Sequence, residues 1–309
     1  MRLIGLLMVI CVCVATHAQS FLDRRSDWQK KELKGSVRTI KTYEVRKLDF
    51  LTAEELKVFQ QSGQKPPYYK KVWTNTLDFN RMGYIMKSRC PESWTGDNYD
   101  MTYNAANQPL CMIRYKDDGS INNSYKFTYD KHGFILYAER RNNESVIFKE
   151  FYTCDNKGNL LRMIHKNEDG GSSENIFEYQ NCKLSKWTIT DNEQPYQTMI
   201  FDGSIDRLKE LYVWNGKHCD HIRISINSAG LPEMAEKETE YGGWYIYVQR
   251  SFDSQNNIIK EIFYNVDGSV SNEKTFSYKY DSYGNWIRKE SKGKGTFDNR
   301  IEEREIIYY

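Results

Sequence analysis

The stretch YDSYGNWIRKE, residues 280–290, has the pattern of a β-hairpin. An aromatic residue is followed by Asp281, two variable positions, Gly284, Asn285 and a new apolar residue. Aspartate at the first turn position accepts a hydrogen bond from a backbone N–H two residues further on, and glycine supplies the positive φ that ends a type I turn. The stretch therefore predicts that the chain reverses direction here, between two strands.

The same pattern recurs along the chain with a period of about 25 residues. Clear copies are FNRMGYI from Phe79, YNAANQPL from Tyr103, YDKHGFI from Tyr129, CDNKGNL from Cys154, FDSQNNI from Phe252 and the opening stretch, and weaker copies begin at Tyr179, Phe201 and Ile226. A second turn signal lies between successive copies, as in KDDGS at 116–120, NEDGG at 167–171 and VDGSV at 266–270. One repeat is thus predicted to contain two strands and two reversals.

Apolar residues alternate with polar ones around each turn, as in the run Phe276, Tyr278 and Tyr280, which is typical of strands with one buried face. An isolated hairpin is marginal in water, so neighbouring copies must stabilise one another. We expect an all-β single domain over residues 19–309, in which about nine hairpin repeats form a curved or spiralling antiparallel sheet. The charged segments RRSDWQKKELKG, 24–35, and EEREIIYY, 302–309, are expected to protect its two edges.

Two segments depart from the repeat pattern. Residues 1–18 have the features of a signal peptide, with Arg2, a short apolar run and small residues before a cleavage point after Ala18. This predicts an exported protein, located in the periplasm, on the cell surface or in the medium, with no transmembrane span in the mature chain. Thr52, Glu55 and Gly63 are capping signals that predict one short helix near 52–62.

The units at Tyr129, Cys154 and Tyr280 resemble the YD repeats of Rhs-type bacterial proteins, whose strand pairs build a spiralling β shell. Short exported bacterial β-repeat proteins are similar over nearly the whole mature chain, from an LKGSVRTIK-like strand to an EREIIYY-like one. The resemblance implies a β-repeat architecture. It does not imply enclosure of a toxin, because the Asp-rich self-cleavage site of such shells is not visible in this sequence.

Composition and motifs narrow the function. The 44 basic and 42 acidic residues nearly cancel and form no block of like charge, so no nucleic-acid partner is expected. The sequence contains no G-x-S-x-G, P-loop or dinucleotide-binding motif, so we expect no enzyme activity and no cofactor. The weak metal candidates His218 and His221, in HCDH, would lie on opposite faces of a strand, and no partner pair follows at zinc-finger spacing.

Three function classes remain open. The leading hypothesis is a non-enzymatic binding or scaffold protein of the bacterial envelope, with a glycan or an envelope protein as its partner. Its proposed site contains Trp244, Tyr245 and Tyr247, because the WYIY stretch has too many rings for one buried face. The alternatives are an outer-membrane β-barrel, which the charges on both faces of strand 146–152 disfavour, and an enzyme with dispersed catalytic residues.

Overall fold

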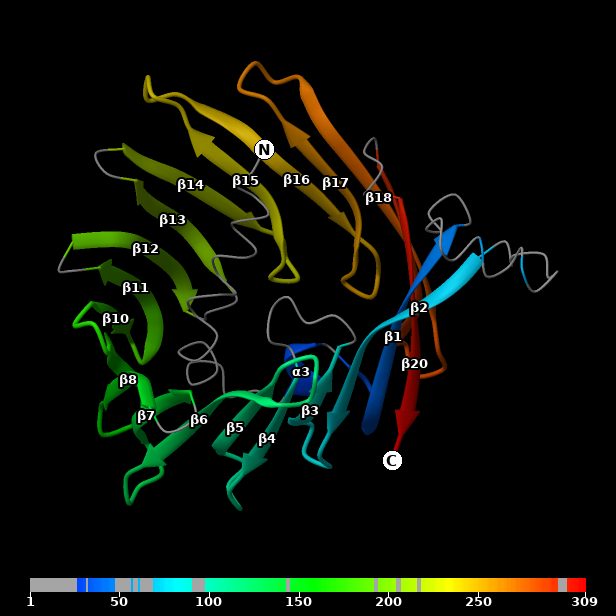
Figure 1. Cartoon of the computed structure of the whole chain (residues 1–309). Coiled ribbons are helices and arrows are strands. Elements are labelled where there is room, and N and C mark those ends of the chain that lie inside the picture. The colour runs from blue at the N-terminus through cyan, green and yellow to red at the C-terminus, as the bar shows by residue number, and fades with distance from the viewer. Residues whose placement is uncertain are drawn as a thin grey trace. The chain divides into compact units, whose positions relative to one another are not determined.

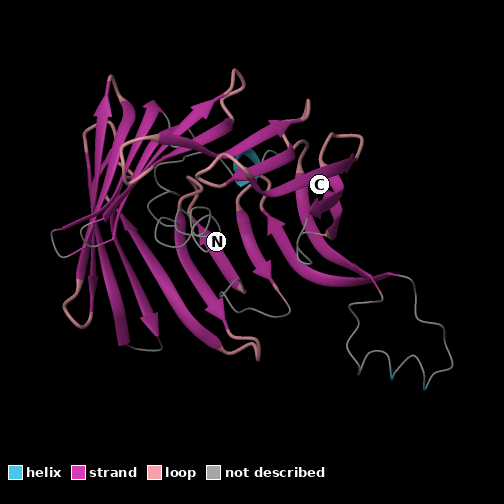
Figure 2. Cartoon of the chain, turned by 90° about the horizontal axis from the view of Figure 1, so that it is seen from above, coloured by secondary structure: helices cyan, strands magenta, loops and turns pink. Residues whose placement is uncertain are grey.

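The computed structural model is almost entirely β, with a single short described helix, α3 (Asp27–Lys30) (Figures 1 and 2). It describes residues 27–31, 33–47, 57, 61, 69–90, 98–142, 145–191, 194–203, 207–215, 218–293 and 299–309. The expected signal peptide, and the expected helix near 52–62 apart from Lys57 and Gln61, lie outside these residues. None of the helices in the described ranges has the length and hydropathy needed to cross a membrane.

Twenty strands follow one another along the chain: β1 (Val37–Lys47), β2 (Tyr69–Phe79), β3 (Ile85–Arg89), β4 (Tyr99–Tyr103), β5 (Pro109–Tyr115), β6 (Ile121–Tyr129), β7 (Ile135–Asn142), β8 (Ser145–Cys154), β9 (Leu160–Asn167), β10 (Ser172–Gln180), β11 (Lys183–Asp191), β12 (Gln194–Gly203), β13 (Leu208–Asn215), β14 (His218–Ile226), β15 (Pro232–Glu238), β16 (Trp244–Phe252), β17 (Ile258–Tyr264), β18 (Val270–Tyr280), β19 (Trp286–Gly293) and β20 (Arg300–Tyr308). The chain divides into two compact units. Unit 1 holds residues 123–250 and 264–269, and unit 2 holds residues 26–122, 251–263 and 270–309. The prediction of a single domain stays a prediction.

The expected turn chemistry is confirmed. In YDKHGFI the N–H of Gly133 donates to the carbonyl of Asp130 over 3.1 Å, and Gly133 has a φ of 81°. The carboxylate of Asp130 accepts the N–H groups of His132 and Phe134, both over 2.8 Å. The same backbone bonding occurs in the turns that begin at Asn80, Asn104, Lys116, Asp155, Asn167, Asn227, Thr239, Asp253, Asn265 and Asp281. Asn107 and Asn256 adopt the positive φ where glycine is absent.

Unit 1 contains strands β6 to β16, each paired antiparallel with the next (Figure 1). The residues on one face form a buried apolar row across five successive strands, at Phe177, Trp187, Met199, Leu211 and Ile222. Burial of such side chains contributes about 1.5–3 kcal/mol each. This row is the alternating apolar face that the sequence predicts.

The opposite face of unit 1 is polar and charged. Lys126 of β6 lies opposite Glu139 of β7, which lies opposite Lys149 of β8, which lies opposite Lys166 of β9. Lys126, Lys149 and Lys166 are exposed. We call this surface the charged face of unit 1.

Unit 2 places β1 between β2 and β20, and the chain of antiparallel pairs runs β5, β4, β3, β2, β1, β20, β19, β18 (Figure 1). The expectation of a curved or spiralling sheet with two separately protected edges is therefore wrong, because the first and last described strands pair with each other. Their side chains explain the pairing: Ile40 lies opposite Ile306, and Lys41 lies opposite Glu305. The charges that suggested edge protection are complementary cross-strand pairs.

The N-terminal lead of unit 2 packs on the first repeat turn. The backbone N–H of Trp28 in α3 donates to the carbonyl of Gly83 over 3.1 Å, and the Trp28 ring lies 6.4 Å from that of Phe79. Asp27 accepts the N–H of Ile85 over 2.7 Å. The core beneath is built from Val37, Ile40, Phe79 and Ile85, all buried. The N-terminal lead is thus fixed to the sheet.

Candidate functional site

The three aromatic residues singled out in the sequence lie on β16, but the structure does not bring them to one face. Trp244 lies opposite Glu238 of β15, and Tyr245 lies opposite Lys237. The register between β15 and β16 shifts after Ile246, so Tyr247 occupies a β-bulge. The sequence gives no sign of this bulge. Binding at these residues stays a prediction.

Trp244 belongs to a compact cluster on the charged face of unit 1. The guanidinium carbon of Arg223 lies 3.7 Å from the Trp244 ring centroid. The His221 ring meets Trp244 edge-on at 4.8 Å and stacks on Tyr212 at 4.1 Å. Trp244 is half-buried, and Arg223 covers one face of its ring. The rings and the guanidinium group of this cluster thus contact one another.

His221, a weak metal candidate, has both ring nitrogens engaged. Nδ1 lies 3.0 Å from Glu238 Oε2, and Nε2 lies 3.0 Å from Glu210 Oε2. A metal-binding imidazole must offer a free lone pair, and both of these nitrogens point at carboxylates instead. The side chain of His218 is outside the described residues, and the part of the chain that is described contains no group of three His, Cys, Asp or Glu able to hold a metal.

Tyr245 lies on the face of unit 1 that carries the apolar row, because Lys237 lies opposite both Tyr245 and Ile222. Lys237, opposite Tyr245, forms an ion pair with Asp220 at 2.8 Å. Burial, together with the nearby Tyr245 and Asp220, raises the pKa of Tyr247 to about 12. The two tyrosine rings lie 6.2 Å apart, edge to face. The Tyr247 hydroxyl therefore stays neutral at physiological pH and can donate a hydrogen bond.

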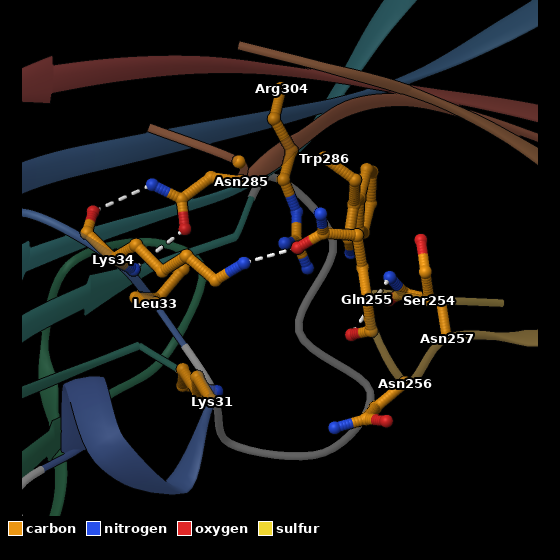
Figure 3. Close-up of a pocket in the computed structure, with 11 residues that line it drawn as sticks. Lys31, Leu33, Lys34, Ser254, Gln255, Asn256, Asn257, Asn285, Trp286 and Arg304 are labelled. Atoms are coloured by element: carbon orange, nitrogen blue, oxygen red, sulfur yellow. Dashed lines mark hydrogen bonds between the residues drawn. The ribbon is translucent and has the colours of Figure 1, made fainter. Parts of the chain in front are cut away.

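Unit 2 contains a cavity of about 380 Å³ that the sequence does not point to (Figure 3). Four segments line it: the lead after α3, the turn after β16, the turn after β18, and the middle of β20. The lining residues are Lys31, Leu33, Lys34, Ser254, Gln255, Asn256, Asn257, Gly284, Asn285, Trp286 and Arg304. We call it the unit 2 pocket. Its polar lining and its position between repeat turns make it a candidate site.

Hydrogen bonds fix the walls of the unit 2 pocket. The buried Asn285 accepts the N–H of Lys34 over 2.7 Å and donates back to the Lys34 carbonyl over 2.7 Å. The Lys34 ammonium reaches across to the side-chain oxygen of Gln255 (Figure 3). Asn257 donates to the hydroxyl of Tyr280 over 2.8 Å. These hydrogen bonds thus hold the lead and both turns in fixed positions around the pocket.

Arg304 brings a largely buried positive charge to the pocket. Its guanidinium carbon lies 3.3 Å from the Trp286 ring centroid, and its Nε is buried with no hydrogen-bond partner among the described residues. Burial lowers the pKa of Arg304 to about 10. The side chain is still cationic at neutral pH, so it brings an incompletely solvated positive charge to the pocket.

Comparisons with known proteins give similarity to solved structures only. No protein-family model and no curated protein matches the chain. A porin-like protein from Bacteroides uniformis aligns with 89% of this chain and 98% of its own at 12% identity and a TM-score of 0.39. A porin-like protein from Bacteroides vulgatus aligns with 87% and 97% at 12% identity and a TM-score of 0.30. The TcdB2-TccC3-Cdc42 structure aligns with 73% of this chain and 16% of its own, at 10% identity and a TM-score of 0.34.

Similarities of this strength carry no argument about function, which has to come from the residues. Of the three open function classes, the β-barrel alternative agrees best with the strand pairing, because β1 and β20 leave no unpaired edge between them.

Proposed function

We propose that this chain is an exported, non-enzymatic β-barrel protein of the bacterial envelope. The observation that carries the proposal is the antiparallel pairing of β1 with β20, added to the pairing of consecutive strands within each unit. An up-and-down order in which the first strand pairs with the last is the topology of a closed barrel, which removes sheet edges. The signal-peptide features of residues 1–18 support export.

The charged face of unit 1 supports a barrel surrounded by water. A lipid-facing strand needs an apolar outward row, and Lys or Arg at the bilayer midplane costs about 2–4 kcal/mol. The row Lys126, Glu139, Lys149 and Lys166 crosses four successive strands. Further pairs continue it, since Lys186 contacts Glu178 at 2.8 Å and Glu210 lies opposite Arg223. These charges are solvated easily in water.

An outer-membrane barrel is the second candidate, and a different observation favours it. Large apolar side chains are also exposed in unit 1, including Leu136, Phe151, Leu161, Ile176 and Ile246. Some of them lie between the charges, as Phe151 does next to Lys149 on alternate positions of β8. Exposed aromatic and aliphatic residues are the groups that contact lipid in such barrels.

Purification of the mature chain, residues 19–309, without detergent distinguishes the aqueous barrel from the outer-membrane barrel. The aqueous barrel predicts a monodisperse protein with a cooperative, β-type unfolding transition, and no association with liposomes that survives a salt wash. The outer-membrane barrel predicts aggregation without detergent and recovery of the fold in detergent micelles. A chain that folds in neither solvent, or that shows no cooperative β transition, would contradict the barrel proposal itself.

A further inference from the structure

Three of the described residues that line the unit 2 pocket are cationic, and the carboxylates that act on them, Asp27 on Lys31 and Glu302 on Arg304, are not among its lining residues. Lys31, Lys34 and Arg304 all line it, and none of its eleven described lining residues is Asp or Glu. Glu302, two residues before Arg304 on β20, acts on Arg304 through its charge and also lies 3.9 Å from Lys289 of β19. Because like charges repel when they share a cavity, this arrangement favours the arrival of a negative group.

Among the described residues, the aspartates of the flanking turns form no ion pair with these cations. Asp253 accepts the N–H groups of Gln255 and Asn257 and the hydroxyl of Tyr280. Asp281 accepts the N–H groups of Tyr283 and Asn285 and the hydroxyl of Tyr308. Both carboxylates are therefore committed to holding the turns.

Arg304 is the group that most needs a ligand. Stacking on Trp286 fixes its plane, and its Nε lies buried without a partner among the described residues. A buried donor left unpaired costs about 1–3 kcal/mol, which an acceptor would recover. Guanidinium groups match the paired oxygens of carboxylates and phosphates in geometry and charge.

The remaining lining residues suit the rest of a hydrophilic molecule. Ser254 and Asn256 are exposed at the turn after β16 and carry hydroxyl and amide groups. Small-molecule pockets typically have volumes of about 300–1,000 Å³, so a cavity of about 380 Å³ holds a molecule larger than a bare anion. Lys31 and Lys34, which are exposed, line the pocket from the lead after α3 and attract an anion from solution (Figure 3).

We propose that the unit 2 pocket binds a small hydrophilic solute through a carboxylate or phosphate group, with Arg304 as the main contact. The inference goes beyond the barrel proposal and does not depend on it, because every residue it uses belongs to unit 2. Lys34 and Lys31 contribute through charge, and Trp286 keeps the guanidinium in place.

Titration calorimetry on the mature chain tests the proposal at constant ionic strength. The probes are inorganic phosphate, glucose 6-phosphate, glucuronate and, as the neutral comparison, glucose. Binding of an anionic probe with no binding of glucose is the expected result. Binding of the two phosphates identifies a phosphate site, and binding of glucuronate alone identifies a carboxylate site.

Three variants test whether binding occurs in the unit 2 pocket. Arg304→Met keeps the apolar stem over Trp286 and removes the charge, so affinity should fall by about tenfold or more. Lys34→Gln should weaken binding less, because Lys34 is exposed. Arg300→Gln, on the same strand but outside the pocket, should leave affinity unchanged.

The thermal midpoint separates a ligand role from a structural one. Removing an unpaired charge should leave the midpoint of Arg304→Met equal to that of the parent or higher. If Arg304→Met is destabilised, Arg304→Lys provides the second measurement, and it should retain part of the affinity because the charge remains. Failure of every anionic probe to bind at millimolar concentration, or parental affinity in Arg304→Met, would overturn the proposal.

Discussion

The hydroxyl of Tyr308 in β20 donates a hydrogen bond to Asp281, 27 residues before it, just as Tyr280 in β18 donates to Asp253 at the same separation. The asparagines match as well, with Asn285 donating to Tyr308 over 2.9 Å and Asn257 donating to Tyr280 over 2.8 Å. β20 therefore takes the place that the strand of a following repeat would occupy. It completes the last turn and pairs with β1 on its other side.

Removal of the Tyr308 hydroxyl should weaken this junction. Tyr308→Phe leaves Asp281 with one donor fewer and Asn285 with one acceptor fewer, so we expect a loss of about 1 kcal/mol or more in the free energy of unfolding. Urea unfolding measures it. Tyr283→Phe is the control, since its exposed ring stacks on Tyr308 while its hydroxyl makes no hydrogen bond among the described residues. Equal losses in the two variants would mean that the hydroxyl contributes nothing.

A repeat turn can need glycine for its positive φ or for lack of space for a side chain. Gly158 and Gly170 distinguish these two reasons. Both have positive φ, 80° and 89°, so alanine strains the backbone at either position. A Cβ at Gly158 would lie 2.3 Å from the ring of Phe134 in the previous turn, whereas Gly170 has nothing within 4 Å. Gly158→Ala should therefore destabilise the protein by about 1 kcal/mol more than Gly170→Ala. Equal thermal midpoints would show that adjacent turns do not pack as described.

His165 gives the fold a pH dependence of predictable sign. Its pKa is raised, first by the hydrogen bond to the buried Glu150 and also by Asn167, while Arg140 opposes the shift. Nδ1 lies 3.4 Å from Glu150, and Nε2 lies 2.8 Å from Asn167. Because the folded pKa exceeds the unfolded value of about 6.5, the stabilisation is fully present below that pH and is lost as pH rises through the folded pKa.

The measurement is the free energy of unfolding in urea from about pH 5.5 to about pH 8.5, for the parent and for His165→Gln. The advantage of the parent should shrink as pH rises, because only the parent loses a bound proton. Glu150 is hydrogen-bonded by Tyr152 over 2.6 Å in both proteins, so that contact cancels in the comparison. A difference that stays constant, or that grows with pH, would show that the His165 pKa is not raised.

The local part of the fold could be predicted from sequence because its causes are local. Asp130 and Gly133 encode their turn within four residues, and the alternation around Phe177 and Trp187 identifies the buried face. The pairing of β1 with β20 could not be predicted in this way. Ile40 and Ile306 have no pattern in common beyond alternation, and charged residues beside them suit an edge strand as well as an interior one.

The site was harder to predict for the same reason. Lys34, Gln255 and Arg304 are each unremarkable in sequence, and they meet only because two repeat turns and the lead converge in unit 2. The sequence places a binding site at Trp244, Tyr245 and Tyr247 because the WYIY stretch has too many rings for one buried face, and that site stays a prediction. Trp244 and Tyr245 lie on opposite faces because successive strand residues alternate, and nothing within residues 244–247 signals the bulge at Tyr247.

Hydrogen exchange of the β20 amides tests most directly whether the sheet closes at its ends. Because β20 has β1 on one side and β19 on the other, amides pointing both ways should be bonded in its central part. Residue-resolved exchange of the mature chain should therefore show continuous protection through Ile301, Glu302 and Glu303, which have partners in both neighbouring strands, matching the central strands of unit 1 such as β11. Protection at alternate residues only, with the others exchanging as fast as loop amides, would mean that β20 is an open edge and would contradict the account.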